Sequence, residues 1–333
     1  MERLRDVDET ELLARVFPVY AGAVPVDATA VPVGPGDDAA VLAAPSGTVV
    51  VTTDGMVRGR DWRDEWSTAH DVGVKVAAQN LADVAAMGAV STGLLVSLVA
   101  DPGLAVEWAV DLARGIASVA AEAGAPVVGG DLSSGPAGVV TVTVTALGDL
   151  RGRRPVLRSG ARVGDVVAVC GSLGWSGGGL ALLLGGGAVP EAGERLVRYH
   201  RAPRPPWESG PLAADAGATA LVDVSDGLVT DLGRVARASG VGIDLSGAVL
   251  EERFAAGPLT TCLGPAEALR QVLAGGEEHS LAACFPPGTD LGALPGAPWV
   301  AVGRVVAAGE GAPAVTVDGV VPDARGWDHF AGA

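Results

Sequence analysis

The chain has 333 residues, a formal net charge of −16 and 49% hydrophobic residues, so it can bury a large core and has a length that favours two domains. Such an acidic protein is not expected to bind nucleic acid or an anionic membrane, because both demand basic surface. The charged N-terminal stretch and the lack of any unbroken apolar run of transmembrane length predict a cytoplasmic protein.

Lysine and cysteine usage excludes several nucleotide and metal sites. Lys75 is the only lysine and lies between two valines, whereas a Walker-type P-loop needs its lysine directly after glycine. The motifs of protein kinases are also missing from the sequence. Cys170, Cys262 and Cys284 are far apart in apolar surroundings, which is typical of buried thiols and not of a zinc site.

The first predicted feature after an amphipathic helix within residues 1–20 is an acidic β-hairpin. Residues 39–43 and 48–53 have the character of short strands, and the short turn between them predicts antiparallel pairing. Asp38 opens the first strand and Asp54 closes the second, so both carboxylates are expected at one end of the hairpin. Like charges that close repel unless a cation lies between them.

A long helix is predicted from Ser67, as its cap, to about Met87. Lys75, Gln79 and Asp83 are spaced four residues apart, so they share one stripe of this helix. The stripe fits either an exposed polar face or a buried one. Burial is favoured, because the rest of the helix is almost entirely alanine and valine.

The remaining elements of the N-terminal half predict an α+β sandwich with helices on one side of a sheet. They are a strand at 93–100, a helix at 104–123, a strand at 126–128 leading into Gly129-Gly130-Asp131, and a strand at 139–147. The last strand alternates valine and threonine, so one of its faces is polar. We expect that face to be free for a partner, such as a second subunit.

The basic run Arg151–Pro155 is predicted to be a linker, which divides the chain into an N-terminal domain at 1–150 and a C-terminal α/β domain at 151–333. The glycine-rich stretch 171–179 is expected to feed a helix from about Leu180. As a phosphate cradle this stretch is weak evidence, because a flexible loop of the same composition is at least as good an interpretation.

The C-terminal half has a second acidic corner where a strand at 219–224 enters Ser225-Asp226-Gly227, before a helix that ends near Ala238. Ser225 or Asp226 suits a helix N-cap, and a helix N-terminus also attracts phosphate, so both roles stay open. A helix at 263–273, a turn at Gly275-Gly276-Glu277 and a strand at 280–285 follow.

Acids thus recur among small residues at the ends of apolar segments throughout the chain. Grouped in space, they would provide the oxygen ligands that Mg²⁺ prefers, with a polyphosphate completing the coordination. The repetition favours this interpretation over solvated turn residues, which each motif alone would suggest.

In this order, the motifs resemble the thiamine-monophosphate kinases, a family within the superfamily of aminoimidazole ribonucleotide synthetase-like ATP enzymes. The likeness covers nearly the whole chain. Its markers are GDDAAVL at 36–42, TTD at 52–54, NLADVAAMGA at 80–89, GGD at 129–131, RSGARVGD at 158–165, VSDGLVTDLG at 224–233, GGEEHSL at 275–281 and WDHF at 327–330.

The resemblance implies phosphoryl transfer from ATP to thiamine monophosphate, which gives thiamine diphosphate and ADP, in a homodimer whose N-terminal sheets close against each other. It implies that several Mg²⁺ ions are held by Asp38, Thr52, Thr53, Asp54, Asp83, Asp131, Asp223 and Asp226. Of these, Asp38, Asp54 and Asp83 would act in catalysis through the metal, and no general base is expected. ATP would meet Gly130, Asp131, Arg158 and Ser225, and the thiamine end would meet Glu277 and the ring of Trp327.

Three departures from the family pattern concern the acceptor. Asp61 stands where the family usually has a histidine associated with the substrate, and we expect Arg60 to take over the phosphate contact. Leu132-Ser133 replaces a usual pair of threonines, and Glu278-His279 replaces Asp-Tyr. The alternatives are therefore another ATP-using enzyme of the superfamily with a changed acceptor, or an inert nucleotide-binding paralogue.

Overall fold

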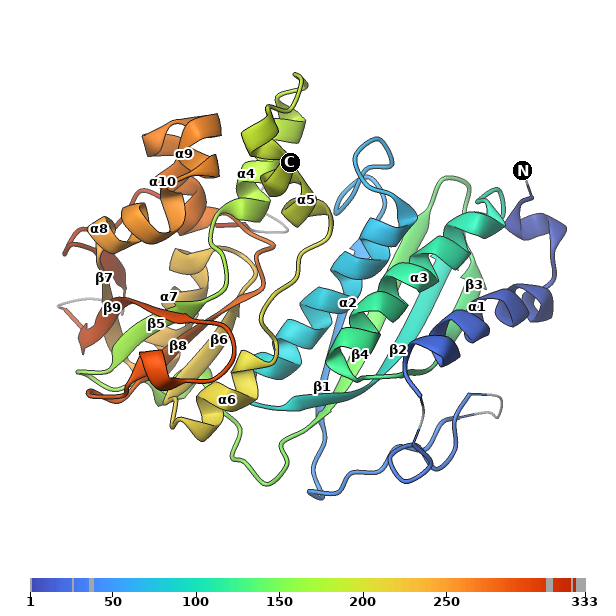
Figure 1. Ribbon diagram of the computed structural model, residues 1–333, viewed down its shortest axis with the longest axis horizontal. Helices are drawn as coiled ribbons and strands as arrows, with labels where there is room; N and C mark the ends of the chain where they lie inside the picture. The colour runs from blue at the N-terminus through green and yellow to red at the C-terminus, as the bar shows by residue number, and fades with distance from the viewer. Residues whose placement is uncertain (1, 26, 36–38, 310–313, 325, 328–333) are drawn as a thin grey trace. The chain divides into compact units, whose positions relative to one another are not determined.

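The computed structural model describes the whole chain apart from residues 1, 26, 36–38, 310–313, 325 and 328–333. Contacts divide the chain into two compact units. The first comprises residues 1–84 and 90–152, and the second comprises residues 85–89 and 153–333. Each unit has its own sheet and its own helices (Figure 1).

The first unit is built on a four-stranded sheet in the order β1-β4-β2-β3. Its strands are β1 (Val50–Val57), β2 (Val90–Ala100), β3 (Val127–Ser134) and β4 (Val140–Asp149). Its helices are η1 (Leu4–Asp6), α1 (Glu9–Ala23), α2 (Ala69–Ala86) and α3 (Val106–Ala123). Strand β4 is antiparallel to β1 and β2, whereas β2 and β3 are parallel, with α3 in the crossover between them.

Strand β4 has one buried face and one partly exposed face. Val142 and Val144 have no exposed surface, whereas the neighbouring Thr143 and Thr145 are partly exposed. Helices α2 and α3 run side by side over one face of this sheet (Figure 1). The alternation confirms the predicted strand with one polar face.

Glycine allows α2 and α3 to approach closely. A Cβ atom on Gly73 would lie 2.2 Å from the carbonyl oxygen of Leu112, and one on Gly115 would lie 2.1 Å from that of His70. Neither position has room for a side chain. Alanine and valine fill the rest of α2, as expected of a helix that is buried on most sides.

The second unit is built on a six-stranded sheet in the order β10-β7-β9-β5-β8-β6. Its strands are β5 (Val166–Cys170), β6 (Ala220–Val224), β7 (Val241–Leu245), β8 (Ser280–Phe285), β9 (Trp299–Ala307) and β10 (Val315–Val317). Its α-helices are α4 (Trp175–Leu184), α5 (Glu194–Arg201), α6 (Ser209–Asp215), α7 (Leu228–Ser239), α8 (Gly247–Leu250), α9 (Pro258–Leu263) and α10 (Pro265–Ala274). Short 3₁₀-helices are η2 (Arg158–Gly160), η3 (Glu191–Gly193) and η5 (Leu291–Ala293), and η4 (Glu251–Ala255) is a π-helix.

Both faces of the second sheet are buried. Along β5, Val167 and Val169 belong to one apolar cluster, while Ala168 and Cys170 belong to another. Such a strand is apolar at every position because it packs on both sides. The mixed sheets and their helices confirm the expected α+β fold class. No helix among the described residues has both the length and the apolar character needed to cross a bilayer.

The predicted hairpin at the start of the chain is wrong. Residues 39–43 form no strand, and Val41 makes only an isolated bridge to Val33. Strand β1 pairs along its length with β4 instead. Asp54 therefore lies within β1 and does not close it, because the non-local partner offers eight paired positions with a buried face.

The predicted cap of the long helix is shifted by one residue. Thr68, not Ser67, forms the cap: its hydroxyl accepts the N–H of Asp71 at 3.2 Å, and the Asp71 carboxylate accepts the N–H of Thr68 at 3.0 Å. This reciprocal pair satisfies two donors at the start of α2. Gly124, with φ of 64°, ends α3 as expected.

Two expectations for the second unit also need correction. Helix α4 begins at Trp175, so the glycines at 177–179 are helical and not part of a loop. Helix α7 has Gly227 at its N-cap position with no side-chain cap, so neither Ser225 nor Asp226 caps it. Gly227 has φ of 112°, and a Cβ there would lie 2.8 Å from the backbone of Ala274, which restricts the position to glycine.

Candidate active site

In the first unit, hydroxyl and carboxylate oxygens gather where the edge of β1 meets α2. The Thr52 hydroxyl donates to the Asp83 carboxylate at 2.8 Å. Two residues along β1, the backbone N–H of Asp54 donates to the Asn80 side chain at 2.9 Å. Asn80 has no exposed surface, and its own amide donates to the carbonyl of Val76 at 2.8 Å. The structure thus brings Thr52, Asp54 and Asp83 to one place.

The stripe predicted on α2 is largely buried. Lys75 is 3% exposed, while Gln79 and Asp83 are partly exposed. The only lysine of the chain therefore lies inside the protein and is not a surface anchor for phosphate.

Thr53 and Asp131 lie on the opposite face of the sheet from Thr52 and Asp83. The Thr53 hydroxyl is 2.9 Å from that of Thr145 on β4. Asp131 is in register with Ser97 on β2 and accepts from the hydroxyl of Ser133 at 3.0 Å. Because β1 and β3 are the two edge strands, about 14 Å separates them across three strand spacings.

Gly130 precedes Asp131 in β3 and is required by packing. A Cβ at this position would lie 1.8 Å from the carbonyl oxygen of Val96 on the neighbouring strand. Within one copy of the first unit, Gly130 and Asp131 are thus separated from the oxygens at the edge of β1. Their expected contacts with ATP and metal stay a prediction.

The segment after β1 holds the predicted acceptor residues Arg60 and Asp61. The Asp61 carboxylate accepts the backbone N–H of Val57 at 2.6 Å, so this acid closes its own turn. Arg58 forms an ion pair with Asp64. Arg60 is exposed. A carboxylate turned towards the backbone repels an approaching phosphate less than one that points outward.

In the second unit, Asp223 stands at the end of β6 with 3% of its surface exposed. Its carboxylate lies 3.2 Å from Nδ1 of His279. The backbone N–H of His279 donates to the carbonyl of Val224 at 2.8 Å. This places the end of β6 and the turn before β8 side by side, with a buried acid between them.

Asp226 follows in the loop between β6 and α7 and is held by two residues of that helix. Its backbone N–H donates to the Asp231 carboxylate at 2.9 Å, and Arg234 forms ion pairs with both acids. Burial raises the pKa of Asp231 to about 7, and the charge of Asp223 acts in the same direction. A cation bound nearby would relieve this crowding of carboxylates.

Trp327 and Ser225 lie beside Asp226. The backbone N–H of Trp327 donates to the carbonyl of Asp226 at 2.9 Å, and 57% of the tryptophan is exposed. Gly326 must be glycine, because a Cβ would lie 1.9 Å from the same carbonyl. Ser225 accepts the N–H of Glu277 at 2.7 Å through its own carbonyl. Ser225, Asp226, Glu277 and Trp327 are thus brought together.

Arg158 lies elsewhere in the second unit. Its carbonyl accepts from the hydroxyl of Ser239, the last residue of α7, at 2.8 Å. Asp226 precedes the first residue of the same helix, and a helix of this length spans about 18 Å. The backbone of Arg158 therefore sits at the other end of α7 from the acidic corner, and its expected contact with ATP stays a prediction.

The side chains at the edge of β1 and those at the end of β6 both offer oxygen ligands. Such ligands suit a hard divalent cation, since Mg²⁺ is bound by carboxylates and hydroxyls. Across the described residues, no three His, Cys, Asp or Glu side chains are already arranged around a common point. Asp38 lies outside those residues. A phosphate chain and water would have to complete the coordination of any ion held by the described acids.

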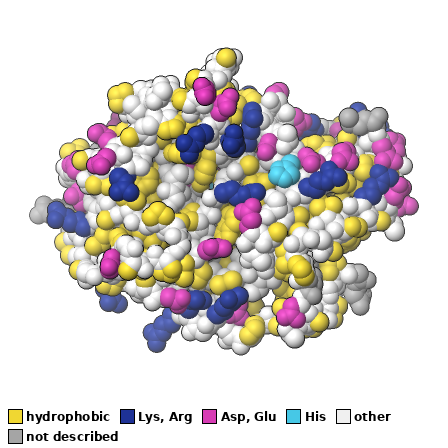
Figure 2. All heavy atoms as spheres, viewed as in Figure 1, with side chains coloured by type: hydrophobic (Ala, Val, Ile, Leu, Met, Phe, Trp, Pro, Cys, Tyr) yellow, Lys and Arg dark blue, Asp and Glu magenta, His cyan; other side chains and the backbone are white. Residues whose placement is uncertain are grey.

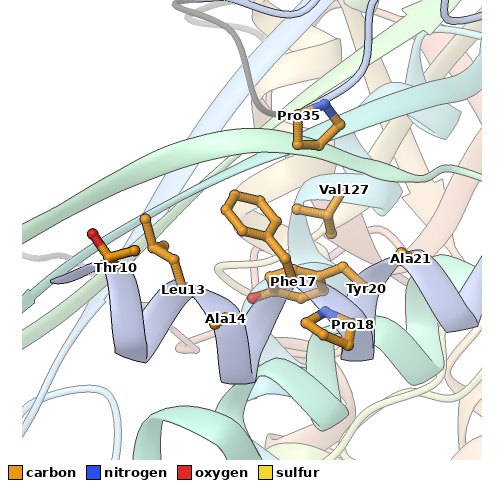
Figure 3. A pocket seen from close by; sticks show the side chains of 9 residues that line it. All are labelled: Thr10, Leu13, Ala14, Phe17, Pro18, Tyr20, Ala21, Pro35 and Val127. Atoms are coloured by element: carbon orange, nitrogen blue, oxygen red, sulfur yellow. The ribbon is translucent and has the colours of Figure 1, made fainter. Parts of the chain in front are cut away.

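An apolar pocket in the first unit has a different character. About 570 Å³ in volume, it is lined mainly by α1, including Leu13, Phe17 and Tyr20, with Pro35 and Val127 opposite (Figure 3). None of the nine residues that line it carries a charge at neutral pH. We therefore place no phosphoryl-transfer chemistry there.

Several site residues are not predictable from the motifs alone. Asp231 lies within the VSDGLVTDLG motif, and its helical i, i+3 spacing from Arg234 is the local signal that could have paired the two residues. Glu278 gives no such signal, because its partners Ser172 and Ser176 are more than 100 residues away. Asn80 belongs to the NLADVAAMGA motif, but its contact with Asp54 depends on the packing of α2 against β1.

Comparison with known proteins gives matches over most of the chain. Residues 36–150 match the family model "AIR synthase related protein, N-terminal domain", and residues 162–315 match "AIR synthase related protein, C-terminal domain". The solved structure "Crystal structure of Thiamine-monophosphate kinase from Stenotrophomonas maltophilia K279a" is similar with a TM-score of 0.78 at 29% identity, covering 94% of this chain and 96% of that one. The structure "AaThiL complexed with AMPPCP and TMP" is similar with a TM-score of 0.76 at 28% identity, covering 99% of both chains.

Curated relatives extend the likeness. The thiamine-monophosphate kinase of Escherichia coli (strain K12) is 33% identical over 336 residues, covering 97% of this chain and 98% of the relative. That of Mycobacterium tuberculosis (strain CDC 1551 / Oshkosh) is 46% identical over 300 residues, covering 90% of this chain and 84% of the relative. With this identity over this coverage, the chain belongs to the thiamine-monophosphate kinase family of AIR synthase related proteins.

Proposed function

We propose that this protein transfers the γ-phosphoryl group of ATP to thiamine monophosphate, giving thiamine diphosphate and ADP. The observation that carries the proposal is the grouping of Thr52, Asp54 and Asp83 at the edge of β1, a set of oxygens suited to a metal–polyphosphate complex. Curated relatives with this activity in their names, and a similar structure described as a complex with AMPPCP and TMP, support it.

The chemistry needs positive charge more than it needs a base. The attacking phosphate is already anionic, so the barrier comes mainly from bringing two anions together in line. Bound Mg²⁺ would supply the charge that neutralises both phosphates. We propose Asp54, Asp83 and Thr52, with Asp38, as its holders in the first unit, and Asp223 and Asp226 in the second. Thr53 and Asp131 lie on the other face of the first sheet, so the metal contacts expected of them stay a prediction. No general base is proposed.

Surface charge supports the need for a metal. On the face drawn in Figure 2, basic side chains are interspersed with acidic ones. The basic side chains of the surface are arginines, since Lys75 is buried. Individual arginines can fix one phosphate oxygen pair each, but the net charge of −16 makes bound cations the larger source of positive charge.

The proposed contacts with thiamine monophosphate lie at two places, the segment after β1 and the acidic loop between β6 and α7. We propose that Glu277 and the exposed ring of Trp327 meet the thiamine end, and that Arg60 meets its phosphate beside Asp61. Gly130, Asp131, Arg158 and Ser225 are the proposed ATP contacts. The ring of Trp327 is 57% exposed and can stack on the flat heterocycle of thiamine. The partly exposed carboxylate of Glu277 suits the positive charge of that heterocycle.

A homodimer is proposed from the polar face of the first sheet. Thr141, Thr143 and Thr145 on β4 are only partly exposed, while Val51 and Val57 on β1 are 60% and 39% exposed. A second copy that packs against this face would bury those valines and cover the threonine rows. It would also add a second Asp131 to the interface. The enzyme is proposed to act in the cytoplasm, where its substrate ATP is available.

The positions of the residues that depart from the family pattern argue against the alternative of a changed acceptor. Glu278 and His279 point into the protein, to Ser172 and to Asp223, and the Asp61 carboxylate closes its own turn. The replacements at Asp61, Glu278 and His279 therefore add no outward-facing group on the acceptor side. Ser133, of the Leu132-Ser133 replacement, is exposed, and its effect on the acceptor stays a prediction. The test is direct: purified protein with ATP, Mg²⁺ and thiamine monophosphate yields thiamine diphosphate. ATP binding without product would favour the inert paralogue, and turnover of another phosphate acceptor would favour the changed one.

A further inference from the structure

Glu278 is a carboxylate with no exposed surface and with both oxygens engaged. Oε2 accepts from the hydroxyl of Ser172 at 2.8 Å, and Oε1 accepts the backbone N–H of Ser176 at 2.6 Å. Its backbone carbonyl accepts from the hydroxyl of Tyr199 at 2.9 Å. A charge buried this deeply costs several kcal/mol unless such donors compensate it, so a carboxylate here has a specific use.

The first use is to cap a helix. Helix α4 begins at Trp175 after Gly174, which has φ of 76° and provides no side-chain cap. The first N–H groups of a helix need an acceptor, and a negative charge there also interacts favourably with the helix dipole. Glu278 supplies both from the turn before β8, far away in the sequence. The start of α4 is therefore tied to that turn.

The second use is to hold a turn that is locally unfavourable. Glu277 and His279, on either side of Glu278, have φ of 60° and 54°, in the left-handed region that side chains disfavour. Their N–H groups donate to Ser225 and Val224 at 2.7 and 2.8 Å. The turn is thus fixed to β6 by its flanking residues and to α4 by its central one.

A contact through α5 joins this network to Glu277. Nδ1 of His200 lies 3.1 Å from the hydroxyl of Ser176 and 3.4 Å from a carboxylate oxygen of Glu277. Ser176 therefore contacts Glu278 through its N–H and His200 through its hydroxyl. The Glu277 side chain is 35% exposed, so this member of the network reaches solvent.

The glycine-rich stretch makes this arrangement tight. A Cβ on Gly177 would lie 2.2 Å from the side chain of Gln271, and one on Gly174 would lie 2.8 Å from the backbone of Val272. Helix α10 therefore packs closely against the start of α4, beside the turn 275–279. A helix start that is packed in this way is a fixed platform and not a flexible flap.

From these contacts we infer that Glu278 is a positioning residue, whose buried carboxylate clamps the start of α4 to the turn 275–279 and so presents Glu277 to the acceptor substrate. The inference rests on the proposed function for the identity of that substrate, thiamine monophosphate. Glu278 touches neither substrate nor metal in this arrangement. It acts through the geometry of Glu277.

Glu278→Gln tests the clamp. The amide has the same shape, and its oxygen can still accept the N–H of Ser176 while its NH₂ group donates to the Ser172 hydroxyl. The charge of the carboxylate is lost, however, so both bonds become weaker neutral ones and the start of α4 loses its favourable negative charge. At pH 8, above the raised pKa of Glu278, we expect the KM for thiamine monophosphate to rise about 10-fold while the KM for ATP stays within about twofold. Glu278→Asp keeps the carboxylate and should recover most of the acceptor affinity.

Ser172→Ala provides a milder version of the same loss. It should raise the acceptor KM by a smaller factor, and it should add little to Glu278→Gln in the double variant, because both changes weaken the same contact. This variant keeps the test informative if Glu278→Gln folds poorly. Asp165→Asn is the matched control, since Asp165 is also a buried acid of the second unit, holding Arg162 and Thr219, away from the turn.

A second readout needs no substrate. In Glu278→Gln the amides of Glu277 and His279 should exchange hydrogen about 10-fold faster, whereas those of β5 should not change. If the wild type does not phosphorylate thiamine monophosphate, the proposed function fails while the exchange data still decide on the clamp. Unchanged exchange together with an unchanged acceptor KM, or equal rises in the KM of acceptor and ATP, would overturn the inference.

Discussion

The hydroxyl of Thr52 donates to the carboxylate of Asp83 at 2.8 Å, which joins the edge strand of the first sheet to the last turns of α2. An edge strand has unpaired backbone groups on its outer side, and α2 satisfies one of them through Asn80, which accepts the N–H of Asp54. The helix thus holds the strand through polar contacts. The same contacts gather the oxygens that the proposed reaction needs.

Asp54→Asn should abolish turnover and leave the fold intact. The contact that Asp54 makes with Asn80 uses its backbone N–H, so a side-chain change spares it. Loss of one carboxylate from the proposed metal site should lower kcat at least about 100-fold. Steady-state assays with added Mg²⁺, together with thermal unfolding, would measure both effects. A variant that unfolds at the wild-type temperature and keeps most of its activity would contradict the metal assignment.

Arg60→Ala tests the phosphate contact proposed for the segment after β1. Arg60 is exposed and next to Asp61, whose carboxylate is held by the N–H of Val57. Loss of a charge-assisted bond should raise the KM for thiamine monophosphate about 10-fold with little change in stability. Arg63→Ala is the control, because the Arg63 guanidinium lies 4.6 Å from the ring centroid of Trp66 and has no proposed ligand. An acceptor KM unchanged by Arg60→Ala removes the proposal.

Strongly periodic stretches of the fold could be predicted from the sequence. The Val/Thr alternation of β4, the apolar run of β5 and the glycine that ends α3 each carry a local signal, and each is found in the structure. The pairing of β1 could not be predicted in this way. Its partner β4 lies about 90 residues later, and the nearby residues 39–43 offered a local hairpin with the right turn chemistry.

The site was predictable only in part, for a similar reason. Acids at strand ends indicated Asp223 and Asp226, and the structure places both at the end of β6. Which groups hold them in place depends on tertiary packing. Arg234 has only its i, i+3 spacing from Asp231 as a local signal, and the role of Glu278 has none. The face on which Asp131 lies depends on the register of β3 with β2, which one residue of slip would reverse.

Gly73→Ala should destabilise the first unit. A Cβ at this position would lie 2.2 Å from the Leu112 carbonyl, so α2 and α3 must move apart and lose packing. We expect the free energy of unfolding to fall by about 3 kcal/mol. Gly22→Ala is the matched control, since Gly22 is also helical and a Cβ added there would have no atom within 4 Å. The control should be neutral or slightly stabilising in urea unfolding. Equal effects of the two changes would contradict the close packing.

Stability should depend on pH through Glu278. Burial raises its pKa from 4.5 to about 7, and the bonds from Ser172 and Ser176 only partly oppose this. Between these two pH values the folded protein keeps a proton that the unfolded chain has released. The free energy of unfolding should therefore fall as pH rises through this window, by about 3 kcal/mol at most, because each pKa unit corresponds to about 1.4 kcal/mol.

Glu278→Gln isolates that contribution, since glutamine does not titrate. Unfolding of both proteins in urea between pH 4.5 and 8, with a chelator present, gives two curves. Asp231, whose pKa burial also raises to about 7, contributes equally to both and cancels in their difference. The free energy of unfolding of Glu278→Gln, minus that of the wild type, should rise with pH and become constant above about pH 8. A difference that stays constant across the whole range would mean that Glu278 is already ionised in the folded protein at pH 5.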